Sequence, residues 1–151
     1  MKNILFVCTG NACRSAAAEF VLRQLLAEKG IDDVCVDSVG TSNWGANPRD
    51  AVMTKVAQEH GYHMEGNTKV MTTEVLDNAD LILVMESCHR DKVTSQLRYD
   101  HWDRICLFND YCFGEKTPVE DPYYQSEAIY RAVFDVIERG CKEILVKLAE
   151  P

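Results

Sequence analysis

The sequence predicts an α/β fold: a four-stranded parallel sheet with helices on both faces and the flavodoxin-like strand order 2-1-3-4. Short apolar runs alternate with helical patterns along the chain, which is typical of a doubly wound sheet. The apolar runs are nearly continuous in hydrophobicity, as expected of parallel strands that are buried on both faces. The expected strands are residues 4–8, 34–38, 81–85 and 105–108.

The expected helices follow from apolar periodicity and from the residues at their ends. The first covers residues 16–29 and stops at Gly30, a residue type that favours helix termination. The last covers residues 126–149, in which Gly140 marks either a bend or a point of close packing. Three shorter helices are expected over residues 50–60, 73–78 and 89–97.

The length and charge of the chain restrict its class. A length of 151 residues suits one domain, and no repeat or linker indicates a second. No apolar stretch is as long as a transmembrane helix and no signal peptide is recognisable, so we expect a cytoplasmic protein. The net charge of −8 argues against nucleic-acid binding, and it means that an anionic ligand must be attracted locally.

The seven cysteines are odd in number and include no C-x2-C pair. Neither a disulfide framework nor a zinc site is therefore expected. Most of these thiols are expected to be structural and to stay reduced. Cys8 and Cys13 are the exceptions, because both lie in the loop that follows the first strand.

That loop places the Cys8 thiol and the Arg14 guanidinium six residues apart at the start of a helix. Its backbone N–H groups can converge on one oxyanion, with the helix dipole behind them. Arg14 can bind two phosphate oxygens at once, and the positive field favours the Cys8 thiolate. The pattern indicates phosphoryl transfer through a cysteine. A structural loop with a buried cysteine is the alternative, but the preceding strand, the following helix and Gly10 favour an oxyanion site.

A phosphatase also needs an acid that protonates the leaving oxygen. The four histidines lie near expected helix ends or in polar loops, which indicates surface or capping roles. Asp121 is the better candidate, because Pro122 restricts its backbone and residues 110–124 are expected to form a long loop on the same sheet edge as Cys8. The residues themselves leave open a second interpretation, a turn aspartate followed by anchoring tyrosines.

Taken together, these segments make the chain resemble the low-molecular-weight protein tyrosine phosphatases over essentially its whole length. An N-terminal cysteine loop paired with a C-terminal Asp-Pro is highly specific to that family and its close relatives. The matching segments are Cys8 to Ser15, Ala18-Glu19, Asp37-Ser38-Val39-Gly40-Thr41-Ser42, Trp44, Asn47-Pro48 and Asp121-Pro122-Tyr123-Tyr124.

The resemblance implies a catalytic role for three residues and no metal or other cofactor. Cys8 would attack phosphorus and form a phosphocysteine, Arg14 would bind the phosphoryl oxygens, and Asp121 would act as acid and then as base. Ser15 would stabilise the Cys8 sulfur, while Asn11 and Ser38 would brace the loop. The implied phosphate-binding positions are Thr9, Gly10, Asn11, Ala12, Cys13 and Arg14.

The resemblance also implies an aromatic slot and a class of substrate. Trp44 and Tyr123, with Tyr124 beside them, would contact the phenyl ring of phosphotyrosine, which phosphoserine is too short to replace. The partners would be tyrosine-phosphorylated proteins, acted on by a monomer. Cys13 could form a reversible disulfide with Cys8 that protects it from irreversible oxidation. Tyr123 and Tyr124 also match positions that kinases phosphorylate in some family members.

The chain departs from the family pattern at several positions. Thr9 and Ala12 stand where bulkier apolar residues are common, which predicts a wider and more polar slot. Ala16 replaces a common proline, and both are compatible with a first helical turn. A histidine that braces the loop in many members is replaced by Gly66-Asn67, and Asn67 is the candidate substitute unless the bracing is simply weaker.

Two other functions compete with the phosphatase. A thioredoxin-coupled arsenate reductase shares such a loop but needs two further cysteines on a mobile segment; Cys88 has no partner close behind it, and Cys106 lies in an expected strand. A catalytically idle phosphotyrosine-binding module would lack the nucleophile or the acid, whereas Cys8 and Asp121 are both present. The phosphatase is therefore the preferred prediction.

Overall fold

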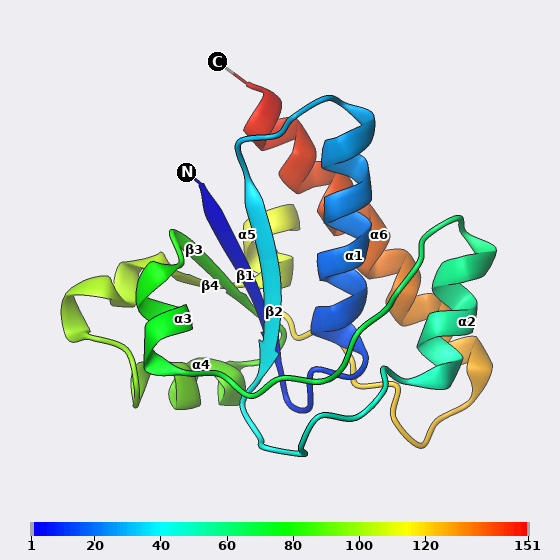
Figure 1. Ribbon diagram of the computed structural model, residues 1–151, viewed down its shortest axis with the longest axis horizontal. Coiled ribbons are helices and arrows are strands. Elements are labelled where there is room, and N and C mark those ends of the chain that lie inside the picture. The colour runs from blue at the N-terminus through cyan, green and yellow to red at the C-terminus, as the bar shows by residue number, and fades with distance from the viewer. Residues whose placement is uncertain (1, 151) are drawn as a thin grey trace.

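The computed structural model describes residues 2–150 and confirms the predicted fold class. Its parallel sheet has four strands in the order β2-β1-β3-β4 (Figure 1). The strands are β1 (Asn3–Cys8), β2 (Cys35–Gly40), β3 (Leu81–Val84) and β4 (Ile105–Leu107). The helices are α1 (Arg14–Glu28), α2 (Ala51–Glu59), α3 (Thr73–Asn78), α4 (Ser87–Thr94), α5 (Phe108–Phe113) and α6 (Glu127–Ala149), with a 3-10 helix η1 (Tyr99–Arg104) before β4.

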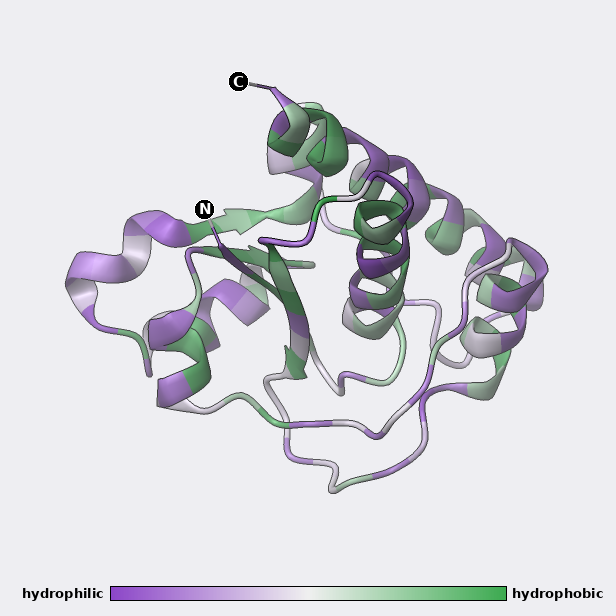
Figure 2. Ribbon diagram, turned by 45° about the horizontal axis from the view of Figure 1, so that its top comes forward, coloured by the Kyte–Doolittle hydropathy of each residue, from purple (hydrophilic) through white to green (hydrophobic). Residues whose placement is uncertain are grey.

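The two faces of the sheet are covered by different helices. Helices α1, α5 and α6 lie on one face and α3 and α4 on the other, while α2 packs beside α1 and α6 (Figure 1). Strand β1 shows why both faces are apolar, because successive side chains of a strand point to opposite sides. Ile4, Phe6 and Cys8 join the α1/α6 core, and Leu5 and Val7 join the α3/α4 core. In Figure 2 the strands are accordingly mostly green, apart from polar residues at the start of β1 and within β2, and the outer helices are striped green and purple.

Two elements were not predicted from the sequence. Helix α5 begins at Phe108, directly after β4, so the expectation of an uninterrupted loop from residue 110 to residue 124 was wrong. Six residues are too few to show helical periodicity, and the helix depends instead on the buried Phe108 ring, whose centroid lies 6.1 Å from that of Phe6. The 3-10 helix η1 was likewise missed, and none of its residues is buried.

Gly140 is a point of close packing in a continuous α6. A Cβ atom at this position would lie 2.4 Å from the ring of Phe108, closer than any packed pair of carbons allows. The glycine therefore lets α6 approach α5. None of the helices within residues 2–150 is both long enough and apolar enough to cross a membrane.

Candidate active site

The loop from Cys8 to Arg14 joins the end of β1 to the start of α1, at the carboxyl edge of the sheet. Such edges are where open α/β sheets bind ligands. Asn11 has a left-handed backbone with a φ of 60°, which asparagine adopts more readily than most residues. Gly40 at the end of β2 allows the close approach, because a Cβ there would lie 2.6 Å from the Thr9 carbonyl oxygen. These features curl the loop against the neighbouring strand.

Cys8 is buried at the base of this loop, and Ser15 lies against its sulfur. The Ser15 hydroxyl oxygen is 3.0 Å from Sγ, and the Ser15 backbone N–H donates to Sγ over 3.5 Å. Both groups can donate to a thiolate, and charge-assisted hydrogen bonds of this kind are stronger than neutral ones. The surroundings of Cys8 therefore suit an anionic sulfur.

Arg14 is a buried cation that neighbouring acids hold in place. Its Nη1 donates to a Glu86 carboxylate oxygen over 2.6 Å and to the Val119 carbonyl over 2.9 Å, while Nη2 lies 3.6 Å from Oδ2 of Asp121. Burial alone would lower the pKa of Arg14, but Cys8, Glu86 and Asp121 outweigh it and raise the pKa. The guanidinium is therefore charged and fixed in orientation.

The structure brings Asp121 to the same cleft, although it lies more than a hundred residues from Cys8 in sequence. Its side chain is about half exposed, and Oδ1 accepts a hydrogen bond of 3.1 Å from the backbone N–H of Tyr123. Pro122 behind it is buried and anchors the segment. Asp121 thus stands at the mouth of the cleft, within reach of solvent.

Aromatic side chains form the outer walls of the cleft. The rings of Trp44 and Tyr123 have centroids 6.1 Å apart, and the Trp44 ring lies directly over Gly10, where a Cβ would come within 1.9 Å of it. Tyr124 packs on Tyr123 but is almost fully exposed and does not line the cleft. The cleft is narrow, with a volume of about 20 Å³. It is lined by Cys8, Thr9, Gly10, Ala12, Cys13, Arg14, Trp44, Asp121 and Tyr123.

Cys13 lies in the same cleft lining and is buried. Burial, followed by the charge of Asp50 and the neighbouring Cys8, raises the pKa of its thiol well above the ordinary value. Cys13 is therefore a neutral thiol at physiological pH. All seven cysteines fall within the described residues, and each of them is free.

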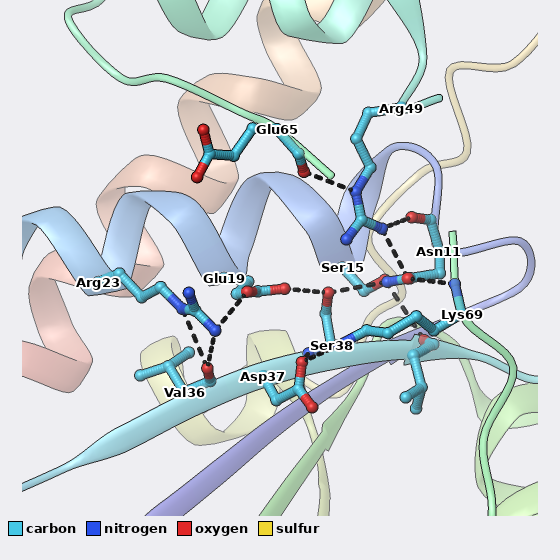
Figure 3. A network of polar contacts seen from close by, with 11 residues as sticks. Asn11, Ser15, Glu19, Arg23, Val36, Asp37, Ser38, Arg49, Glu65 and Lys69 are labelled. Atoms are coloured by element: carbon cyan, nitrogen blue, oxygen red, sulfur yellow. Dashed lines mark hydrogen bonds and ion pairs between the residues drawn. The ribbon is translucent and has the colours of Figure 1, made fainter. Parts of the chain in front are cut away.

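Asn11 stands at the centre of a buried polar network behind the loop (Figure 3). Its amide nitrogen donates to the hydroxyls of Ser15 and Ser38 over 2.9 and 2.8 Å. Its Oδ1 accepts from Nη1 of Arg49 over 2.6 Å and from the backbone N–H of Lys69 over 2.9 Å. The residues expected to brace the loop are thus in mutual contact, and Arg49 joins them.

The network continues from Ser38 to a buried acid. The Ser38 hydroxyl donates to Glu19 over 2.5 Å, and Glu19 also pairs with Arg23 over 2.8 Å (Figure 3). Burial raises the pKa of Glu19, although Ser38 and Arg23 both act against that shift. Among the described hydrogen bonds to Asn11, none comes from Asn67, whose backbone instead forms a bridge with Pro48.

Sequence reasoning missed the contacts made by Glu86 and His89. His89 is buried in the first turn of α4, so a surface role is excluded, although its Nδ1 does accept the Glu86 backbone N–H over 3.1 Å as a capping residue would. Nε2 therefore carries the ring proton and donates to the Thr9 hydroxyl over 2.9 Å. Burial and the charge of Arg14 lower the pKa of His89 to about 4, which keeps the ring neutral. No sequence signal links residue 89 to residue 9.

Comparisons with known proteins show the family of the chain. Residues 3–151 match the family model of the low molecular weight phosphotyrosine protein phosphatases. The chain is 35% identical over 149 residues to the low molecular weight protein-tyrosine-phosphatase Etp of Escherichia coli (strain K12), covering 98% of this chain and 95% of Etp.

Two solved structures extend the comparison. A low molecular weight phosphotyrosine phosphatase from Vibrio cholerae O395 superposes with a TM-score of 0.92 at 27% identity, over 99% of this chain and 98% of the other. A YwlE arginine phosphatase mutant with a phosphorylated active-site serine superposes with a TM-score of 0.88 at 27% identity, over 98% and 96%. With a family match along nearly its whole length, the chain belongs to the low molecular weight phosphotyrosine protein phosphatase family.

Proposed function

We propose that this protein hydrolyses phosphotyrosine in proteins, and other aryl phosphate monoesters, through a phosphocysteine intermediate without a metal. One observation carries the proposal: Cys8, Arg14 and Asp121 line a single narrow cleft whose outer walls are Trp44 and Tyr123. A nucleophile, an oxyanion-binding cation and an acid then meet where an aromatic ring can be held.

In the first step the Cys8 thiolate attacks phosphorus in line with the leaving oxygen. The new S–P bond forms as the P–O bond to the phenol breaks, and Asp121 donates its proton to that oxygen. Arg14 and the loop amides bind the equatorial oxygens, where charge is distributed in the transition state. The bonds from Arg14 to Glu86 and Val119 keep the guanidinium oriented for this task.

In the second step water replaces the thiolate at phosphorus. The Asp121 carboxylate takes a proton from the attacking water, the S–P bond breaks, and inorganic phosphate leaves. The Cys8 sulfur departs as a thiolate, and the Ser15 hydroxyl stabilises it from 3.0 Å away. The enzyme returns to its starting state with Asp121 protonated.

The aromatic walls support an aryl substrate. The Trp44 and Tyr123 rings, tilted by 36° with centroids 6.1 Å apart, form an aromatic surface against which a phenyl group can pack and bury apolar area. Since one superposing structure is an arginine phosphatase, phosphoarginine is the discriminating alternative substrate. The Thr9 hydroxyl accepts a hydrogen bond from His89 and keeps its own proton as a donor.

We also propose that the protein acts in the cytoplasm and as a monomer. Seven free thiols suit a reducing compartment. Cys8, Arg14 and Asp121, the residues to which the proposed chemistry assigns roles, lie together in the cleft of one copy of the chain, which supports a monomer.

The test is a substrate panel with wild type and Cys8→Ser, run with and without a chelator. We expect wild type to release phosphate from phosphotyrosine peptides far faster than from phosphoserine or phosphoarginine peptides, with no effect of chelation and no turnover by Cys8→Ser. Thioredoxin-coupled arsenate reduction is measured alongside. Faster phosphoarginine hydrolysis, or arsenate reduction in place of phosphatase activity, would overturn the proposal.

A further inference from the structure

We propose that Arg49 is a positioning residue of the phosphate-binding loop: it holds back the Asn11 carbonyl and so directs the Ala12 N–H into the cleft. The proposal rests on the function proposed above and deepens it, because it assigns Arg49 a task in phosphoryl binding. Arg49 lies between β2 and α2 and is not among the residues that line the cleft.

Arg49 contacts Asn11 twice with a single nitrogen. Its Nη1 donates to the Asn11 carbonyl oxygen over 2.5 Å and to the side-chain Oδ1 over 2.6 Å (Figure 3). The guanidinium is itself fixed, because Nε donates to the Glu65 carbonyl over 3.2 Å and the Phe20 ring lies 5.9 Å away. Only 9% of the residue is exposed. Arg49 is thus a rigid, largely buried clamp on the backbone and side chain of Asn11.

The contact with the Asn11 carbonyl also determines the direction of the next backbone N–H, that of Ala12. In a trans peptide the C=O of one residue and the N–H of the next point in opposite directions. No cis peptide bond occurs within residues 2–150. Since Arg49 stands behind the loop, a carbonyl drawn toward Arg49 leaves the Ala12 N–H directed toward the cleft, where a phosphoryl oxygen would accept it.

Three other loop carbonyls are held in a similar way, but by backbone groups. The N–H groups of Thr41, Ser42 and Asp50 each donate over 2.9 Å, to the carbonyls of Cys8, Thr9 and Ala12 respectively. Among these four loop carbonyls, that of Asn11 alone receives a side-chain donor. A substitution at Arg49 therefore releases the Asn11 carbonyl, together with one contact of the Asn11 side chain, and leaves the other three carbonyls in place.

The experiment compares Arg49→Met with Arg104→Met. Methionine keeps an apolar stem but removes every donor. Arg104 is a matched control because its Nη1 likewise donates to two oxygens, here the backbone carbonyls of Asp77 and Ala79 at 3.2 Å each, beside the opposite edge of the sheet. The readouts are the inhibition constant of inorganic phosphate, the rise in Tm that phosphate produces, and kcat/KM for p-nitrophenyl phosphate.

For Arg49→Met we expect the phosphate inhibition constant to rise about tenfold, as for one lost hydrogen bond to a charged ligand. The Tm rise produced by phosphate should shrink accordingly. We expect kcat/KM to fall on the order of 10²-fold, since the loop is misaligned in the transition state. Arg104→Met should lower Tm yet keep the wild-type phosphate response. If Arg49→Met only lowers Tm and binds phosphate like wild type, Arg49 is structural and the proposal is overturned.

Two further variants keep the test decisive if Arg49→Met does not fold. Arg49→Lys retains the charge and one donor group, and Arg49→Gln retains a neutral donor. The proposal requires both variants to bind phosphate more weakly than wild type, with a smaller loss of affinity in Arg49→Lys than in Arg49→Gln. Wild-type phosphate affinity in both variants would overturn it. The Tm rise produced by phosphate needs no turnover, so a wild type that fails to hydrolyse aryl phosphates would refute the proposed function while leaving the role of Arg49 testable through that rise.

Discussion

The buried ring of His89 donates a hydrogen bond from Nε2 to the Thr9 hydroxyl, 2.9 Å away, and so ties helix α4 to the phosphate-binding loop. The ring makes this bond together with a second one, in which Nδ1 accepts the Glu86 N–H, and that second bond requires a neutral imidazole. Burial and Arg14 lower the pKa of His89 to about 4, which satisfies that requirement at neutral pH. The charge state of this one histidine is therefore coupled to folding.

Because of this coupling, we expect the free energy of unfolding to decrease as the pH is lowered. The folded pKa of His89 is depressed below the unfolded value of 6.5, so the unfolded state gains a proton first as pH falls. His89 should therefore lower the free energy of unfolding by about 2 kcal/mol between pH 7 and pH 5. Urea unfolding of wild type and His89→Gln at both pH values measures this. Between the two pH values the free energy of unfolding of His89→Gln should fall by about 2 kcal/mol less than that of wild type. An equal fall in both proteins would refute the coupling.

The role proposed for Asp121 predicts a dependence on the leaving group. Asp121→Asn cannot protonate the departing oxygen, so kcat/KM for phosphotyrosine, which reports the first step and not the later hydrolysis of the phosphocysteine, should fall by on the order of 10² to 10⁴. A good leaving group such as p-nitrophenol departs without help, and its kcat/KM should fall much less. Steady-state kinetics with substituted phenyl phosphates provide the measurement, and an equal loss across the series would exclude Asp121 as the general acid.

Gly10 and Trp44 should behave as one unit. A methyl group at residue 10 would overlap the Trp44 ring, so Gly10→Ala must displace that side chain. We expect Gly10→Ala and Trp44→Ala each to raise KM for phosphotyrosine peptides, and the double variant to be no worse than Trp44→Ala. A double-mutant cycle on kcat/KM tests this non-additivity. Additive losses would mean that Gly10 matters for the loop backbone and not for the slot.

We propose that Cys13, which lines the same cleft as Cys8, protects Cys8 from irreversible oxidation. Peroxide would oxidise the Cys8 thiolate to a sulfenic acid with loss of water, and the Cys13 thiol could then displace a second water to form a disulfide. Activity lost to mild peroxide should therefore return with a dithiol in wild type and not in Cys13→Ser. Peptide mass spectrometry identifies the product. Sulfinic acid at Cys8 as the only product in wild type would contradict this prediction.

The sequence predicts the features that depend on neighbouring residues, and it does not predict those that depend on contacts between residues far apart in the chain. The strand order and the Cys8 loop follow from contiguous patterns, and Asp121 is conspicuous because proline and tyrosine follow it. Arg49 and His89 carry no such signal, since an arginine or histidine among polar residues normally predicts exposure. Their burial depends on contacts with Asn11 and Thr9, which only the folded chain brings near. Helix α5 was missed for the same reason, as packing on Phe6 determines it.

The most direct test of the central claim is an acid-quench experiment with phosphotyrosine peptide labelled with radioactive phosphorus. The wild-type enzyme, stopped during turnover, should carry label on the peptide that contains Cys8, and Cys8→Ser should release no phosphate. Turnover that proceeds with no labelled enzyme, or with label on another residue, would contradict a phosphocysteine mechanism.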